Sequence, residues 1–179
     1  ADGIFIYDRQ EQNFIKVDSP VLTPNACEGT TTLFKVPYFD LGSAYLSQSG
    51  QLYSEAAIAS VGRCYDFGPV FRAEKSKPKR HLTEFWMMDA EAAFVEHDEN
   101  LKLQEGLVRH IVQYVLKNCS EELAMLERDV EKLKKADAPF TRYTYDAAIK
   151  KLNELGSDIK YGEDMGNDDE GLLTKDSVV

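Results

Sequence analysis

Short apolar runs alternate with polar positions through the first half of the chain, and this period of two predicts strands. Strands are expected at five places: 14–17, 33–39, 43–46, 64–74 and 84–94. The last two flank a basic loop that contains Pro78, and proline does not continue a paired strand. These two segments are therefore predicted to form a hairpin.

Apolar residues three and four positions apart predict helices elsewhere. The helical segments expected are 3–12, 51–61, 99–117, 120–135 and a last one that starts after Thr144. Gly62 and Gly156 are expected to end helices, and Asp98 and Thr144 to cap them at their N-termini.

The order of these elements indicates the fold class. Strands come first and helices follow, which favours an α+β fold around an antiparallel sheet. Residues 98–156 are then a helical insertion, and the acidic stretch 157–170 is predicted to be a loop.

Composition narrows the possible partners. The 179 residues are 43% hydrophobic, which indicates a globular chain, and carry a net charge of −10. This acidity argues against broad binding to nucleic acid or to an anionic membrane. One local exception is the basic run of Lys75, Lys77, Lys79, Arg80 and His81. Such a run suits either a solvated loop or a phosphate site.

The three cysteines are Cys27, Cys64 and Cys119. Their odd number and the lack of a C-x-x-C pair argue against a disulfide framework or a zinc site, so a reducing, cytoplasmic compartment is expected. No apolar run approaches the length of a membrane span, and no membrane partner is expected.

The predicted hairpin brings an arginine, a histidine and an aromatic ring toward one place. Arg72 offers a permanently charged fork for phosphate, His81 could reach a terminal phosphate, and Phe85 offers a face for a purine. Alternatively, Phe85 is a core aromatic, and Arg72 forms a surface pair with Glu74. The tight spacing of the set favours a nucleoside triphosphate site.

A second polar group lies upstream. Glu28 sits in a loop, and Gln51 and Glu55 open a helix after Gln48-Ser-Gly. Carboxylate and amide groups around one pocket suit a small zwitterion. Ordinary loop and helix-cap chemistry is the alternative.

Together these residues resemble class II aminoacyl-tRNA synthetases of the aspartyl, asparaginyl and lysyl subgroup, over roughly residues 13–170. Residues 71–94, with Arg72-Ala-Glu74 and Arg80-His-Leu82, look like the second class motif. Residues 14–20 look like the first, with Asn13 in place of a glycine and Ser19 in place of a threonine. The resemblance implies the antiparallel catalytic sheet of that class with flanking and inserted helices.

The resemblance also implies roles for individual residues. Arg72 would hold the α-phosphate of ATP as the catalytic residue. The ATP site would comprise Arg72, Ala73, Glu74, Arg80, His81, Leu82 and Phe85. The amino acid would be bound by Glu28, Gln51, Glu55 and Asp89. Mg²⁺ would accompany ATP, with its ligands outside these residues, and Pro20 would lie at a homodimer interface.

Residues 54 and 55 bear on the choice of amino acid. Aspartate-specific members read Ser-Pro-Gln-Leu-Tyr-Lys-Gln in this helix, and the lysine pairs with the substrate carboxylate. Here Ser54-Glu55 replaces Lys-Gln. A glutamate accepts from a carboxamide and repels a second carboxylate, so asparagine and tRNA(Asn) are the expected substrates, with aspartate as the alternative.

Both ends of the chain look cut, and the third class motif and an N-terminal OB-fold are not found in it. Residues 1–179 alone are therefore expected to activate no amino acid. Two other functions stay open for the whole protein. One is a related enzyme that makes asparagine from aspartate and ammonia through the same adenylate. The other is a non-catalytic module that kept the fold.

Overall fold

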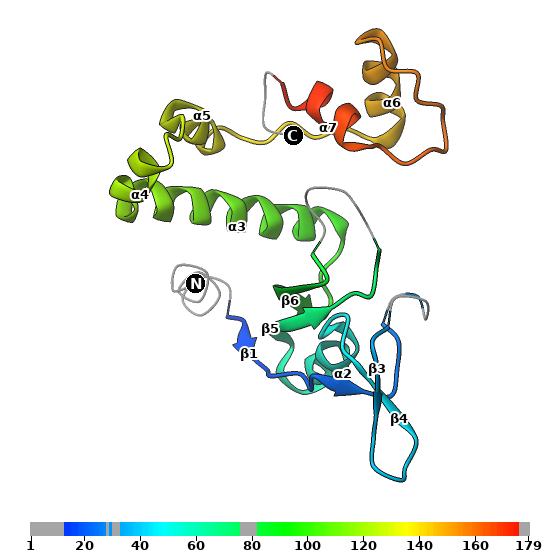
Figure 1. Cartoon of the computed structure of the whole chain (residues 1–179). Helices are drawn as coiled ribbons and strands as arrows, with labels where there is room; N and C mark the ends of the chain where they lie inside the picture. Colours follow the sequence, from blue (N-terminus) through cyan, green and yellow to red (C-terminus); the bar gives the residue numbers. More distant parts are fainter. Residues whose placement is uncertain (1–12, 28, 30–32, 76–81, 176–179) are drawn as a thin grey trace. The chain divides into compact units, whose positions relative to one another are not determined.

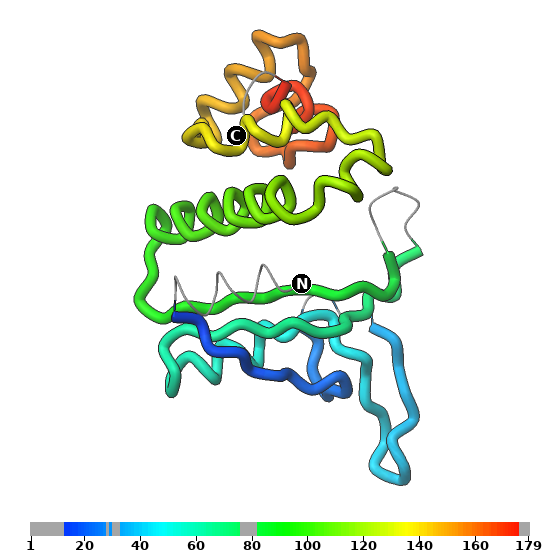
Figure 2. Tube along the Cα trace, turned by 90° about the vertical axis from the view of Figure 1, so that its left-hand side faces the viewer, coloured from blue at the N-terminus to red at the C-terminus, as the bar shows by residue number. Residues whose placement is uncertain are grey.

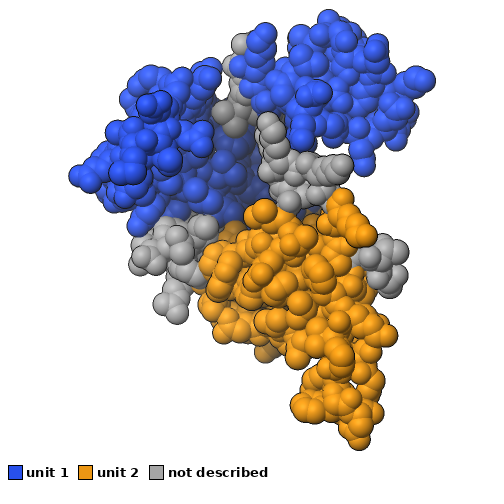
Figure 3. All heavy atoms as spheres, in the orientation of Figure 1, with its two compact units in different colours: residues 1–4, 97–179 blue, residues 5–96 orange. Residues whose placement is uncertain are grey.

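A computed structural model describes residues 13–27, 29, 33–75 and 82–175. The described residues divide into two compact units, one up to Glu96 and one from His97 onward (Figure 3). The helix predicted at 3–12 lies outside the described residues. The α+β class predicted from the sequence is confirmed, because strands dominate the first unit and helices the second.

The main sheet of the first unit contains β1 (Ile15–Lys16), β5 (Arg63–Phe71) and β6 (Glu84–Ala92), in the order β1-β5-β6. β5 and β6 pair antiparallel along their full length and run side by side (Figures 1 and 2). The predicted hairpin is confirmed, but both strands are shorter than expected. β5 stops at Phe71, so Arg72 and Glu74 lie in the segment that leaves it.

A second, smaller sheet was predicted only in part. It joins β2 (Leu22–Thr23), β4 (Ser43–Leu46) and β3 (Lys35–Pro37), all antiparallel. The two strands 33–39 and 43–46 were expected, whereas β2 was not. Two residues between Pro20 and Pro24 are too few for a pattern of alternation, and only pairing with β4 makes them a strand.

Helix α2 (Gln51–Val61) agrees with the sequence prediction and packs against β5 and β6. Gly62 ends it with a φ of 76°, a left-handed value that glycine adopts without steric cost. Its N–H donates to the Ile58 carbonyl at 2.9 Å, and β5 begins at the next residue. The tight ending carries the chain directly from the helix into the strand that it covers.

The second unit opens with α3 (His97–Asn118), whose start differs from the prediction. Asp98 is not the N-cap, because the helix begins one residue earlier. Its carboxylate lies in the first turn, where negative charge still interacts favourably with the helix dipole. No helix among the described residues is long and apolar enough to cross a membrane.

The single helix predicted at 120–135 is wrong. The structure has α4 (Ser120–Met125), α5 (Val130–Lys134) and a 3-10 turn, η3 (Lys135–Asp137). Glu127 takes a left-handed φ of 51°, which interrupts the helix. Asp129 then starts a new one by accepting from the Glu131 and Lys132 amides.

Helix α6 (Tyr145–Glu154) begins as predicted, since the Thr144 hydroxyl accepts from the Ala147 amide at 3.3 Å. The predicted loop 157–170 is wrong at its end, because α7 (Asn167–Leu173) begins within it. This short helix exists because of packing. Its apolar side and Met165 cover a small core from α6 and the residues after it: Ile149, Leu152 and Ile159.

Glu105 connects α3 to the segment after η3. It accepts from Arg109 at 2.9 Å, from Arg142 at 3.2 Å and from the Phe140 amide at 3.3 Å. The amide of Phe140 is the main cause of a lowered pKa of the Glu105 carboxyl, and the bond from Arg142 and the charge of Arg109 lower it further. One carboxylate thus fastens an otherwise irregular segment to the helix.

Because the folded pKa of Glu105 is lowered, its contribution to stability is present above the unfolded pKa, about 4.3, and is lost as pH falls through the folded value. We expect Glu105→Gln to lower the melting temperature at pH 7 and to approach wild type near pH 3. Thermal unfolding across that range measures this. Glu131→Gln removes an exposed ion pair and is the matched control. A pH-independent loss in Glu105→Gln would contradict the assignment.

Candidate active site

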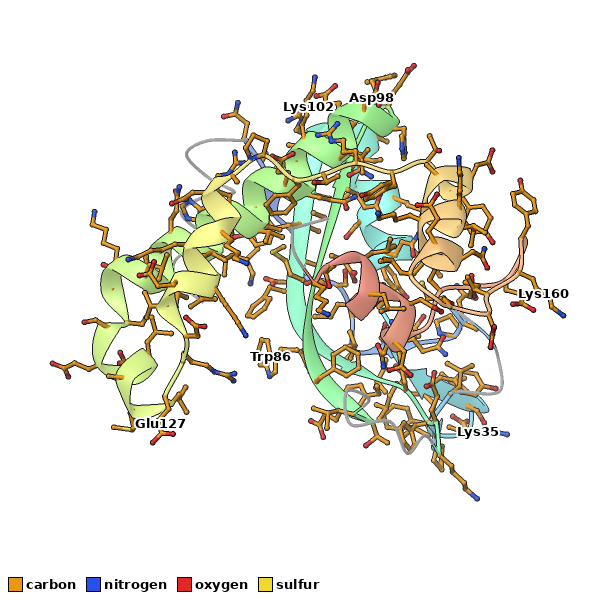
Figure 4. All side chains as sticks on the ribbon, turned by 90° about the horizontal axis from the view of Figure 1, so that it is seen from above. Lys35, Trp86, Asp98, Lys102, Glu127 and Lys160 are labelled. Carbon is orange, nitrogen blue, oxygen red and sulfur yellow. The ribbon has the colours of Figure 1, made fainter. Side chains whose placement is uncertain are left out.

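One face of the β5–β6 hairpin carries two residues that the sequence singled out, Asp89 and Phe85, together with acidic residues that it did not. Residues directly opposite in an antiparallel pair share a face. Asp66 pairs with Asp89, Cys64 with Glu91, and Val70 with Phe85, so these side chains lie on the same face. Trp86 belongs to the other face, where it is 65% exposed and projects from the ribbon (Figure 4).

Asp89 holds the start of α2 on this face. Its Oδ2 accepts from the Ser49 hydroxyl at 2.8 Å and from the Gly50 amide at 2.9 Å. The Ser49 hydroxyl in turn accepts from the Gln51 amide at 3.0 Å. Gly50, the N-cap residue, has no side chain to cap the helix, so a carboxylate from β6 supplies the negative charge at the N-terminus.

Gly50 fits a narrow space between two neighbours. A Cβ at this position would lie 2.2 Å from Oδ2 of Asp66 and 2.8 Å from Oγ of Ser19. Asp66 is only 8% exposed, and Ser19 also donates to the Gly50 carbonyl at 3.3 Å. A side chain at position 50 therefore requires both Asp66 and Ser19 to shift. Sequence reasoning gave no role to Asp66, which stands in no motif, or to Ser49, although Ser49 belongs to the stretch that was compared with aspartate-specific members.

Gln51 and Glu55 lie one helical turn apart and contact each other. Gln51 donates through Nε2 to Oε1 of Glu55 at 3.0 Å. Between them, Ser54 is fully buried against β5, where its carbonyl accepts from the Cys64 thiol at 3.5 Å. Position 54 thus faces the sheet, and Glu55 is exposed.

Glu91 is a further acidic residue that sequence reasoning missed. It is half-buried, and burial raises the pKa of its carboxyl above the ordinary value. The negative charges of Glu55 and Asp89 raise this pKa further. The signal was available, since a residue two positions after Asp89 in a strand shares its face. The site therefore contains Glu55, Asp89 and Glu91 near one another.

At the other end of the same face, Arg72 and Phe85 come together as predicted. The Arg72 guanidinium carbon lies 5.6 Å from the centroid of the Phe85 ring, a cation–π distance. The Arg72 amide donates to the Thr83 carbonyl at 3.0 Å, which fixes the main chain just beyond the paired strands.

The structure describes some of the remaining residues predicted for the site and not others. Ala73 and Glu74 follow Arg72 in the segment after β5, and Leu82 is exposed. Glu28, Arg80 and His81 lie outside the described residues. Among residues that the structure describes, no group of three or more His, Cys, Asp or Glu side chains could hold a metal ion.

Comparison with known proteins shows the family to which this chain belongs. The family model described as tRNA synthetases class II (D, K and N) matches residues 7–177. The chain belongs to the class II tRNA synthetases. Relatives include the asparagine–tRNA ligase of Roseiflexus sp. (strain RS-1), 53% identical over 91% of this chain and 38% of its own length. The corresponding ligase of Herpetosiphon aurantiacus is 49% identical over 90% of this chain and 39% of its own.

Solved structures agree with this family. The asparaginyl-tRNA synthetase from Pyrococcus horikoshii complexed with asparaginyl-adenylate superimposes with a TM-score of 0.88 at 41% identity, over 97% of this chain and 41% of that one. A putative aspartyl-tRNA synthetase from Leishmania major Friedlin gives 0.72 at 26% identity, over 97% and 40%. This class II synthetase chain therefore spans about two fifths of the length of the relatives it matches.

The crowding at position 50 leads to a stability prediction. Gly50→Ala should destabilise the chain by about 1–3 kcal/mol, because the added methyl group meets the buried Asp66 carboxylate. Urea unfolding measures the loss. Gly68→Ala is the control within the same unit, since its Cβ would lie at an ordinary 3.8 Å from Asp66. Adding Asp66→Ala to Gly50→Ala should recover part of the loss, and equal midpoints for Gly50→Ala and Gly68→Ala would refute the explanation.

The raised pKa of Glu91 leads to a prediction of opposite sign. A carboxyl with a raised folded pKa contributes stability below its unfolded pKa, which is lost as pH rises through the folded value. Glu91→Gln should therefore match wild type near pH 3 and melt higher than wild type at pH 7 and above. Thermal unfolding at a series of pH values tests this. A melting temperature below that of wild type at pH 8 would contradict it.

Proposed function

We propose that this chain is the adenylate-forming part of an asparagine–tRNA ligase, which activates asparagine with ATP and transfers it to tRNA(Asn). The observation that carries the proposal is the arrangement on one sheet face. The Arg72–Phe85 pair lies at one end, and Gln51, Glu55 and Asp89 lie near the other. Phe85 and Asp89 are four residues apart in β6, about 13 Å. An amino acid joined through one phosphate to a nucleoside can bridge this span.

At the nucleotide end, Phe85 stacks on adenine and Arg72 neutralises the α-phosphate. Arg80 and His81 hold the outer phosphates in this proposal, and Glu74 orders the loop that carries them. Mg²⁺, with ligands from beyond these residues, supplies further positive charge when bound. Ala73 and Leu82 complete the wall of the ATP site.

The chemical step needs no general base from the protein. The carboxylate of asparagine is ionised at neutral pH and attacks the α-phosphorus, and the bond to pyrophosphate breaks. The task of the site is to hold the two reactants in line and to stabilise the charge that develops on phosphorus-bound oxygens. Arg72 stabilises that charge, and the residues around α2 hold the amino acid in line.

The amino-acid end favours an amide over a second carboxylate. Glu28, Gln51 and Asp89 bind the ammonium group, where Asp89 keeps Oδ1 available while Oδ2 caps α2. Glu55 accepts from the carboxamide, and Glu91 adds negative charge close by. A substrate carboxylate would meet like charges here, which supports asparagine over aspartate.

The remaining parts of the proposal concern assembly. Residues 14–20 lie at a homodimer interface, and residues 98–156 are an insertion in the catalytic domain. Since the chain spans only part of its relatives, residues 1–179 alone carry out no activation. A full-length enzyme that contains them is the form to assay.

The test is ATP–pyrophosphate exchange in that enzyme with asparagine and with aspartate. Asparagine should be preferred, and Glu55→Gln should lower kcat/KM for asparagine roughly 10–100-fold, about 1.4–2.8 kcal/mol of transition-state binding. Glu121→Gln, a change of charge on α4, should leave exchange unchanged. Faster exchange with aspartate in the unmodified enzyme would refute the assignment.

A further inference from the structure

Gln48 is almost completely enclosed, at 1% exposure, in the turn between β4 and α2. Its amide makes two hydrogen bonds to the main chain of one segment. Oε1 accepts from the Cys27 amide at 3.1 Å, and Nε2 donates to the Gly29 carbonyl at 3.0 Å. Both ends of the amide are thus used on residues two positions apart, which fixes the position of that segment.

Cys27 passes this constraint on to the amino-acid pocket. Its thiol donates to Oε1 of Gln51 at 3.7 Å, and Gln51 directs Nε2 to Glu55. A thiol is a weak donor, but Oε1 is the only part of an amide that can accept from it. The contact and the Gln51–Glu55 bond favour the same orientation of the Gln51 amide, with Oε1 toward Cys27 and Nε2 toward Glu55.

The start of the segment is tied down independently. The Thr23 hydroxyl accepts from the Asn25 amide at 3.2 Å and shares a hydrogen bond of 2.9 Å with the Tyr53 hydroxyl of α2. Thr23 is itself buried. With this end anchored to α2, Gln48 adds a further attachment, and it places Cys27 beside Gln51.

We propose that Gln48 is a positioning residue for the amino-acid pocket, acting through Cys27 on the orientation of Gln51. The proposal rests on the function proposed above, because it takes Gln51 as a group that binds the amino acid. It predicts a selective effect. Loss of the Gln48 amide weakens amino-acid binding and leaves ATP binding intact, because Arg72 and Phe85 meet each other at the opposite end of the sheet face from Asp89.

Two variants separate the hydrogen bonds. Gln48→Glu keeps an acceptor for the Cys27 amide and loses the donor to Gly29, whereas Gln48→Leu loses both. In the full-length enzyme, Gln48→Leu should raise KM for asparagine roughly tenfold and Gln48→Glu by less, with KM for ATP within about twofold of wild type. Gln104→Glu, an exposed glutamine of α3, is the control and should change neither value.

A second readout does not depend on catalysis. Cys27 is half-buried, and Cys64 is completely buried. Iodoacetamide should label Cys27 several-fold faster in Gln48→Leu than in wild type, with Cys64 unlabelled in both, as mass spectrometry of the peptides shows. An unlabelled Cys64 certifies that the variant is folded.

The outcomes separate the two proposals. Wild-type enzyme that exchanges pyrophosphate with asparagine, combined with folded Gln48 variants of unchanged KM and unchanged Cys27 labelling, overturns the positioning role alone. Equal rises in KM for asparagine and ATP overturn it as well. Wild-type enzyme that fails to activate asparagine overturns the proposed function, whatever the labelling of Cys27 shows.

Discussion

The bond between Asp89 and the start of α2 is the contact on which the candidate site depends. Charge-assisted hydrogen bonds of this kind contribute about 1.5–3 kcal/mol each, and Asp89 accepts two. Their effect on geometry matters more than their energy. They place the first turn of α2 on the sheet face that also carries Phe85, so the two halves of the site come from elements that Asp89 joins.

The arrangement also explains why the acidic residues of the site are tolerated. Donors at the N-terminus of α2 offset the negative charge of Asp89. The charge of Glu91 has no such donors among the residues that the structure describes, and burial raises the pKa of the Glu91 carboxyl. The site stores some electrostatic cost in the unliganded protein. A ligand that offers N–H donors, such as an ammonium or carboxamide group, relieves that cost on binding.

The sequence predicted the elements whose pattern is local and strong. The hairpin of residues 64–94, α2 with its glycine ending and the Thr144 cap all follow from periodicity or cap chemistry. It failed where distant contacts decide. β2 exists only through β4, α7 through the core of α6, and the break at Glu127 through a backbone conformation that charge patterning does not reveal.

The candidate site divides in the same way. Arg72, Phe85, Gln51 and Asp89 were found because motif spacing marks them. Asp66 and Gln48 were not given roles. Asp66 fills the space beside Gly50, and Gln48 bonds to the main chain of Cys27 and Gly29. Neither kind of contact produces a pattern in a single sequence.

The space at Gly50 constrains how this site could change over time. Proline stands at this position in the aspartate-specific motif to which residues 49–55 were compared, and here the Asp66 carboxylate lies where a Cβ would be. A larger residue at position 50 requires the side chains of Asp66 and Ser19 to shift. A change at position 50 is therefore coupled to residues 66 and 19, so its effect on stability depends on the side chains that already stand there.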